Sequence, residues 1–123
     1  MEDARLFVYG SLMSGLSAAD MLAGAERLGP ARTVDAFALV VLGRYPGLVA
    51  GAASIQGELY RAPDTIWPRL DRYEGAPDLY TRREIELAGG DRAQAYLLNA
   101  RFIARAERID ALDWRVFTGR ASR

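Results

Sequence analysis

The strongest constraint on the fold is the division of the chain into short runs of β-prone residues, several of which end at a glycine or lie next to one. Leu6–Tyr9 is apolar and is followed at once by Gly10. Ile55–Tyr60 alternates between apolar and polar residues, as a strand with one buried face does. The sequence therefore predicts several short strands joined by tight turns.

Three further strands are predicted downstream. Arg32–Leu42 is rich in Val, Ala, Phe and Leu, and we interpret it as one strand that leads into a loop over residues 43–51. Tyr80–Leu87 and Ala93–Leu98 flank the sequence Ala88-Gly89-Gly90-Asp91. Glycine-rich turns of this kind favour a hairpin, so these two strands are expected to pair.

Helices are predicted to be few and short. One begins with Ser17 as its N-cap and ends at Gly24, and a second has Asp64 as its N-cap and Gly75 as its C-terminal stop. The tail over residues 103–117 is expected to be irregular or helical. This order of elements predicts an α+β fold around a curled sheet or small β-barrel.

Length and charge narrow the classes of protein that fit. The 123 residues suit one domain over 1–123. Sixteen acidic residues balance sixteen arginines, so no overall field would draw the protein to nucleic acid or to a membrane. A nucleic-acid surface made by the arginines is the weakest hypothesis, because the arginines are spread along the chain.

The charged N-terminus does not resemble a signal peptide or a membrane span, so we expect a cytoplasmic protein. The oligomeric state of the protein stays open.

The residue types that are missing exclude much familiar chemistry. The chain has no His, Cys or Lys. Ser-His and Cys-His nucleophile systems, zinc sites built from His and Cys, and Schiff-base lysines are ruled out in their usual forms. No carboxylates with metal-like spacing stand out, so we expect neither a metal nor a cofactor. Carboxylates, hydroxyls, backbone amides and arginines are the groups that remain for catalysis.

Glu74 is the leading catalytic candidate. Helical spacing places Ile66, Trp67, Leu70 and Tyr73 on one apolar stripe, and Glu74 projects within it. Burial and the negative end of the helix both disfavour an ionised carboxylate, so the pKa of Glu74 is expected to rise towards neutrality. A general acid/base needs such a pKa. The alternative is an ordinary helix-terminal acid that reaches water or pairs with an arginine.

The glycine turn after the first predicted strand is the leading binding candidate. In Tyr9-Gly10-Ser11-Leu12, consecutive backbone N–H groups can converge to hold a carboxylate or a developing oxyanion. On its own this pattern more often marks a plain turn. The aromatic candidates are Tyr45, beside the Pro46-Gly47 turn, and Tyr80 and Tyr96, which also fit as buried strand aromatics.

Taken in order, these motifs resemble the γ-glutamylcyclotransferase-like family, also called avirulence-induced-gene-like. In chain order the motifs are Tyr9-Gly10-Ser11-Leu12, Tyr45-Pro46-Gly47, Gly57-Glu58-Leu59-Tyr60, the segment from Leu70-Asp71 through Glu74-Gly75, Tyr80 with Arg82, Tyr96, and the closing Asp113-Trp114. The resemblance implies a small mixed β-barrel flanked by a few short helices, with a substrate cavity at its mouth. It also implies release of 5-oxoproline from a γ-glutamyl amide. The family's catalytic glutamate falls on Glu74, its substrate-cradling loop on Tyr9, Gly10, Ser11 and Leu12, and its aromatic after the catalytic helix on Tyr80.

The chemistry implied by this resemblance suits the residues that are present. In a γ-glutamyl amide the substrate's own α-amine is the nucleophile, so the protein needs only to fold the substrate and move protons. The chain departs from the family's pattern at two places near the pocket. It has Met13-Ser14-Gly15-Leu16 where family members often carry basic or amide side chains, and it has Gln94 where an aromatic residue is common. The identity of the leaving amine, and so of the γ-glutamyl substrate, stays open. The alternative function is a non-catalytic small-molecule binding or regulatory module on the same fold.

Overall fold

The structure is a computed structural model that describes residues 4–16 and 19–121. The described chain forms eight strands, three short α-helices and two 3₁₀ helices. In chain order these are β1 (Ala4–Val8), η1 (Ala19–Leu22), β2 (Glu26–Arg32), β3 (Phe37–Leu42), β4 (Tyr45–Ala50), β5 (Gln56–Ala62), η2 (Asp64–Ile66), α1 (Trp67–Glu74), β6 (Tyr80–Glu86), β7 (Arg92–Leu98), α2 (Ala100–Ile103), β8 (Glu107–Arg108) and α3 (Trp114–Ala121).

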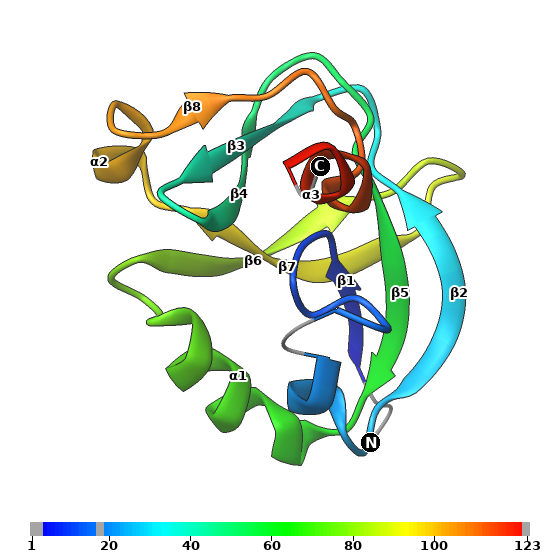
Figure 1. Cartoon of the computed structure of the whole chain (residues 1–123). Coiled ribbons are helices and arrows are strands. Elements are labelled where there is room, and N and C mark those ends of the chain that lie inside the picture. The colour runs from blue at the N-terminus through cyan, green and yellow to red at the C-terminus, as the bar shows by residue number, and fades with distance from the viewer. Residues whose placement is uncertain (1–3, 17–18, 122–123) are drawn as a thin grey trace.

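The strands form two sheets that share a core (Figure 1). The larger sheet has the order β2-β5-β1-β7-β6, and the smaller has the order β4-β3-β8. β1 lies at the centre of the larger sheet, antiparallel to β5 and parallel to β7. β4 of the smaller sheet contacts β7 of the larger one. The expected mixed α+β class with few short helices is confirmed.

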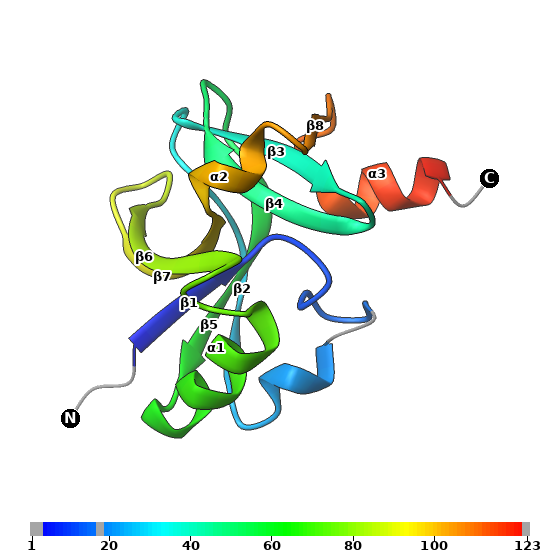
Figure 2. The same cartoon turned by 90° about the vertical axis from the view of Figure 1, so that its left-hand side faces the viewer.

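Apolar side chains from both sheets and from α1 fill the space between them. Leu6 of β1, Leu48 of β4 and Leu70 of α1 are fully buried. α1 lies below the sheets, next to the segment that contains η1 (Figure 2). The guanidinium of Arg69 links the two, because it donates hydrogen bonds to the carbonyl oxygens of Met21 and Ala23 at 3.2 and 2.7 Å. The burial of Leu70 and these bonds hold α1 in place.

The strand predictions are partly correct. β1 and the β6–β7 hairpin form as expected, with Tyr80 opposite Leu98 at one end of the hairpin. The prediction of a loop over residues 43–51 is wrong, because Tyr45–Ala50 is strand β4. Pro46 is tolerated there since β4 is an edge strand, where a residue without an N–H group leaves no ladder bond unmade.

The single strand predicted for Arg32–Leu42 is also wrong. β2 ends at Arg32 and β3 begins at Phe37, and the intervening bend sends the two strands into different sheets. Within the bend, the hydroxyl of Thr33 accepts a hydrogen bond from the Ile55 amide at 2.9 Å. A buried bend of this kind is not visible in the hydrophobic pattern.

The helix boundaries also differ in part. Asp64 is not an N-cap. It is the first residue of the 3₁₀ helix η2, which precedes α1, and the N-cap of η2 is Pro63, which makes no side-chain hydrogen bond. The stop at Gly75 is confirmed, since Gly75 adopts the left-handed conformation with φ 66°. Gly24, with φ 96°, follows η1. The predicted cap at Ser17 lies outside the described residues. The closing tail contains α2, β8 and α3.

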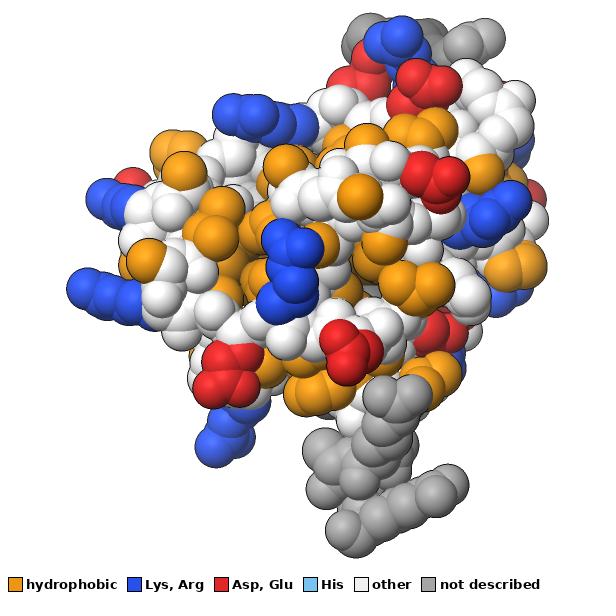
Figure 3. Space-filling view, turned by 90° about the horizontal axis from the view of Figure 1, so that it is seen from above, with side chains coloured by type: hydrophobic (Ala, Val, Ile, Leu, Met, Phe, Trp, Pro, Cys, Tyr) orange, Lys and Arg blue, Asp and Glu red, His pale blue; other side chains and the backbone are white. Residues whose placement is uncertain are grey.

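Charges of both signs are scattered over the surface. Figure 3 shows acidic and basic side chains on one face of the molecule, with hydrophobic side chains among them. Among residues 4–16 and 19–121, no helix combines the length and the apolar character that crossing a bilayer requires.

Candidate active site

Glu74 is held at the end of α1 by a glycine cap. The amide of Gly75 donates to the carbonyl of Arg72 at 3.2 Å, and the amide of Ala76 donates to the carbonyl of Asp71 at 2.9 Å. These bonds terminate the helix, because the left-handed conformation of Gly75 turns the chain away. Glu74 is therefore the last helical residue, one turn beyond the buried Leu70.

The side chain of Glu74 lines a cavity of about 340 Å³. The structure brings all eight site residues predicted from the sequence to this one cavity. They are Tyr9, Gly10, Ser11, Leu12, Tyr45, Glu74, Tyr80 and Tyr96. The wall also includes five residues that were not predicted to belong to the site, which are Phe7, Val8, Pro46, Tyr73 and Leu79.

Burial raises the pKa of Glu74 to about 7, from an ordinary value of 4.5. Removal from water is the cause, because it penalises the ionised carboxylate. The described residues offer Glu74 neither a hydrogen bond nor an ion pair that would offset this penalty. Near neutral pH both the protonated and the ionised forms of the carboxyl group are thus accessible, so it can donate or accept a proton.

The loop after β1 lines the same cavity as Glu74. Gly10 is required for close packing here, since a Cβ atom at this position would lie 2.4 Å from Cγ of Pro46. The Met13 amide donates to the Gly10 carbonyl at 3.0 Å and closes a turn. None of the turn and loop hydrogen bonds in the described chain uses the N–H groups of Gly10, Ser11 and Leu12 as donors. These amides are therefore available to a ligand.

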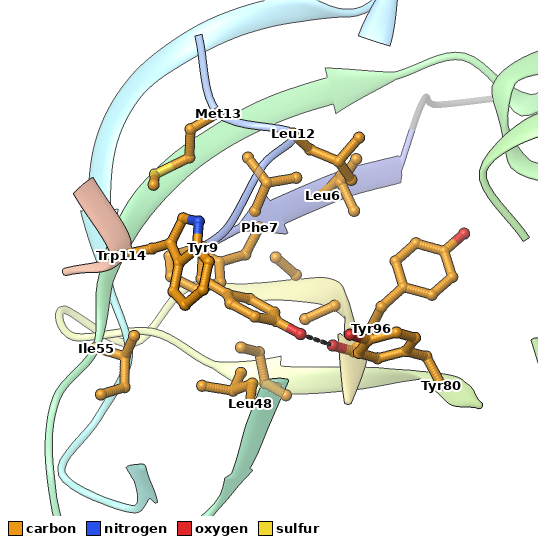
Figure 4. Close-up of a cluster of buried hydrophobic side chains, with 14 of the residues drawn as sticks. Leu6, Phe7, Tyr9, Leu12, Met13, Leu48, Ile55, Tyr80, Tyr96 and Trp114 are labelled. Atoms are coloured by element: carbon orange, nitrogen blue, oxygen red, sulfur yellow. Dashed lines mark hydrogen bonds between the residues drawn. The ribbon is translucent and has the colours of Figure 1, made fainter. Parts of the chain in front are cut away.

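Three buried tyrosines border the cavity, and each donates its hydroxyl proton to the protein. The hydroxyl of Tyr9 donates to the carbonyl of Tyr96 at 2.6 Å (Figure 4). Tyr80 donates to the Pro46 carbonyl, and Tyr96 donates to Oδ1 of Asp71 at 2.6 Å. Burial raises the pKa of all three, and the charge of Glu74 adds to this for Tyr9 and Tyr80. All three hydroxyls stay protonated.

Two other aromatic residues lie nearer to solvent. Tyr45 is 58% exposed, and Tyr73 is 43% exposed. The Tyr73 hydroxyl lies 3.4 Å from Oγ of Ser11, so it links α1 to the loop. Tyr45 and Tyr73 therefore lie where a ligand would enter.

Asp71 supports the site, although the sequence motif that contains it gave it no separate role. It accepts hydrogen bonds from Tyr96 and, at 3.2 Å, from Nη1 of Arg82. The Arg82 guanidinium also lies 4.6 Å from the centre of the Trp67 ring, a cation–π contact. Asp71 lies three residues before Glu74 on the same helix, and residues at this spacing are neighbours on a helix surface. This spacing is the sequence signal that could have placed Asp71 near the site. These contacts join α1 to the β6–β7 hairpin.

The polar groups of the cavity suit proton transfer on a bound ligand. Among the described residues, no group of three or more acidic side chains is arranged to hold a metal ion. In the part of the chain that the structure describes, Glu74 is the one acidic residue that lines the cavity, and no arginine lines it. A negatively charged part of a ligand would therefore rely on the loop amides, while an amine would lie near Glu74.

Known proteins resemble this chain over most of its length. A family model described as gamma-glutamyl cyclotransferase, AIG2-like, matches residues 6–116. A putative gamma-glutamylcyclotransferase of Vibrio cholerae is 40% identical over 69% of this chain and 74% of its own. The gamma-glutamylcyclotransferase family protein YtfP of Escherichia coli is 32% identical over 89% of this chain and 95% of its own. The crystal structure of an AIG2-like protein from Mus musculus has a TM-score of 0.74 at 25% identity, and covers 81% of this chain and 79% of that one.

Proposed function

We propose a reaction for this protein from one premise, which is that the chain belongs to the gamma-glutamyl cyclotransferase, AIG2-like family. The substrate is a γ-glutamyl amine or peptide, and the products are 5-oxoproline and the free amine. Glu74 is the general acid/base. The supporting observation is a partly buried carboxyl group with a pKa of about 7, in a cavity that is also lined by a loop whose backbone amides donate no turn or loop hydrogen bond in the described chain.

The α-amine of the substrate is the nucleophile in this proposal. Its nitrogen attacks the γ-carbonyl carbon and closes a five-membered ring, while ionised Glu74 takes a proton from that nitrogen. The C–N bond to the leaving amine then breaks, and Glu74 returns the proton to the departing nitrogen. Water is not consumed. Ring closure within one molecule supplies the proximity that an enzyme nucleophile would otherwise provide.

The loop amides bind negative charge in this scheme. The N–H groups of Gly10, Ser11 and Leu12 hold either the α-carboxylate or the oxyanion that develops on the γ-carbonyl. The buried tyrosines have committed their protons to Tyr96, Pro46 and Asp71. These hydroxyl protons are therefore not available to a carboxylate or an oxyanion, which leaves the loop amides to bind it.

The test is release of 5-oxoproline from a panel of γ-glutamyl amino acids, γ-glutamyl amines and γ-glutamyl-lysine isopeptide. Glu74→Gln keeps the size of the side chain and removes the base, so we expect turnover to fall by about 10²- to 10⁴-fold. Glu86→Gln is the matched control, because Glu86 is exposed on β6 and does not line the cavity. It should retain full activity.

Two outcomes would count against the proposal. If Glu74→Gln were as active as the unaltered protein, Glu74 would have no role as acid/base. If the protein bound 5-oxoproline or glutamate but turned over no member of the panel, the alternative of a non-catalytic binding or regulatory module would be favoured. Isothermal titration calorimetry with 5-oxoproline separates binding from turnover.

A further inference from the structure

A second and larger cavity, of about 880 Å³, lies away from Glu74. It is bordered by β2 and β5, by the turn between β6 and β7, and by the start of α3, elements that converge in Figure 1. Apart from Met13 and Ser14, which follow the glycine loop, its lining residues come from other parts of the chain than those of the first cavity. We refer to it below as the arginine cleft, after Arg27, Arg32 and Arg115.

The centre of the arginine cleft is a buried carboxylate that is already fully hydrogen-bonded. Glu58 is only 5% exposed. Its Oε1 accepts from the Ser14 amide at 2.7 Å and from the Tyr60 hydroxyl at 3.0 Å. Its Oε2 accepts from the Ser14 hydroxyl at 2.7 Å, and from Arg27 and Arg115 at 3.1 and 3.0 Å. Glu58 therefore has little remaining capacity to hold a cationic ligand.

The two guanidinium groups at Glu58 retain unused donors. Arg27 and Arg115 both contact Oε2 through Nη2 alone, and Nη2 of Arg115 also donates to the carbonyl of Ser14. A guanidinium has five N–H donors in a planar fork. Both side chains are partly exposed, at 44% and 39%. Each arginine can thus offer further N–H groups towards the cleft.

The charges of the cleft are not balanced. Arg32 has neither a hydrogen bond nor an ion pair from its side chain within the described residues. Against the three arginines stand Glu58 and Asp113, and Oδ1 of Asp113 accepts from the Arg115 amide at 2.9 Å at the start of α3. One positive charge is left over. Two cations that share one carboxylate oxygen also repel each other, and a second anion would relieve this repulsion.

We propose that the arginine cleft binds a small molecule through an anionic group with two or more oxygens on one centre, which is a phosphate or a carboxylate. Arg27 and Arg115 are held side by side by Glu58, so their free N–H groups present two forks that such an anion bridges. Arg32 supplies the third cation. The proposal does not depend on the reaction at Glu74, since none of the three arginines lines that cavity.

The experiment is an NMR titration of the ¹⁵N-labelled protein with inorganic phosphate and, separately, with succinate, at constant ionic strength. We expect saturable shifts at the amides of Ser14, Arg32, Gly89 and Arg115. Tighter binding of phosphate would identify a phosphate group as the preferred anion, and tighter binding of succinate would identify a carboxylate. Absence of saturation for both anions at tens of millimolar would overturn the proposal.

Variants distinguish the cleft from general attraction to arginines. Arg32→Gln removes an exposed cation that the fold does not use, and it should weaken anion binding about fivefold. Arg83→Gln is the matched control, because Arg83 is exposed on β6 and lies outside the cleft. It should leave the affinity unchanged. If both variants had the same effect, or Arg32→Gln had none, the arginine cleft would not be the binding site.

Discussion

Glu74 combines a partly buried carboxyl group with a position at the end of a helix, and this affects both its protonation and the stability of the fold. Its pKa of about 7 results from burial. The same loss of hydration that prepares the group for proton transfer makes its ionised form costly in the folded state. Activity and stability should therefore respond to pH in opposite directions.

The first prediction concerns the pH dependence of turnover. Glu74 acts as a base only when ionised, so kcat/KM for a γ-glutamyl substrate should rise with pH through a midpoint near 7. Initial rates of 5-oxoproline release across a pH series measure this midpoint. A midpoint near 4.5, the ordinary value for a glutamate, would show that the acting carboxyl group is not buried.

The second prediction concerns stability. Below pH 4.5 Glu74 is protonated in both the folded and the unfolded states, and its contribution is fully present. Above that value the unfolded state releases the proton while the folded state keeps it up to about pH 7, so stability falls as pH rises through this window. Glu74→Gln removes the effect. Between pH 4 and pH 8, urea unfolding should show the variant gaining up to about 3 kcal/mol over the unaltered protein. Parallel pH profiles would contradict the prediction.

At the scale of elements, the contact between β5 and β1 positions the glycine loop. Val8 is the last residue of β1, directly before Tyr9 and Gly10, and its carbonyl faces Gly57 of β5. A Cβ atom at residue 57 would lie 2.2 Å from that oxygen and 2.7 Å from the Phe7 ring. The absence of a side chain at Gly57 thus lets the two strands approach closely.

The third prediction tests this contact. Gly57→Ala should destabilise the fold by about 1 to 3 kcal/mol, because backbone atoms of the β1–β5 ladder must move to make room. It should also raise the KM for a γ-glutamyl substrate, since the displaced strand carries the loop. Gln56→Ala is the control, because Gln56 is exposed on the same strand. Equal melting temperatures for the two variants would contradict the steric argument.

At the scale of the whole molecule, Glu58 of β5 is bonded to three segments that are distant from it in sequence. Ser14 belongs to the loop after β1, Arg27 to β2 and Arg115 to α3, while its fourth partner, Tyr60, lies two residues away on β5 itself. Burial alone would raise the pKa of Glu58, but the hydrogen bonds from Ser14, Arg27 and Tyr60 outweigh it and lower the pKa to about 2. The ionised form of Glu58 is therefore part of what holds these segments together.

The fourth prediction follows from this lowered pKa. The contribution of Glu58 is fully present above pH 4.5 and is lost as pH falls towards 2. Acid should thus remove on the order of 1 to 3 kcal/mol of stability through this group. Glu58→Gln should flatten the profile between these pH values in chemical denaturation. Glu84→Gln, which changes an exposed carboxylate on β6, should not, and an equal effect of both would contradict the assignment.

Local patterns predicted the features that depend on nearby residues. Apolar runs and glycine positions located β1, the β6–β7 hairpin and the end of α1 at Gly75. They failed where distant residues decide the conformation. Pro46 indicated a turn, but it lies in β4 because an edge strand tolerates it. Alternation in Ile55–Tyr60 does not reveal that Glu58 is buried, since its partners come from three other segments.

The sequence by itself determined the chemistry that is available to this protein, because a chain without His, Cys and Lys leaves carboxylates, hydroxyls and backbone amides for catalysis. It also placed Glu74 at the end of a helix with an apolar side. Only the tertiary structure decided what surrounds that carboxyl group. The cavity wall comes from β1 and the loop after it, and from β4, α1, β6 and β7, and the pKa depends on how completely these segments together exclude water.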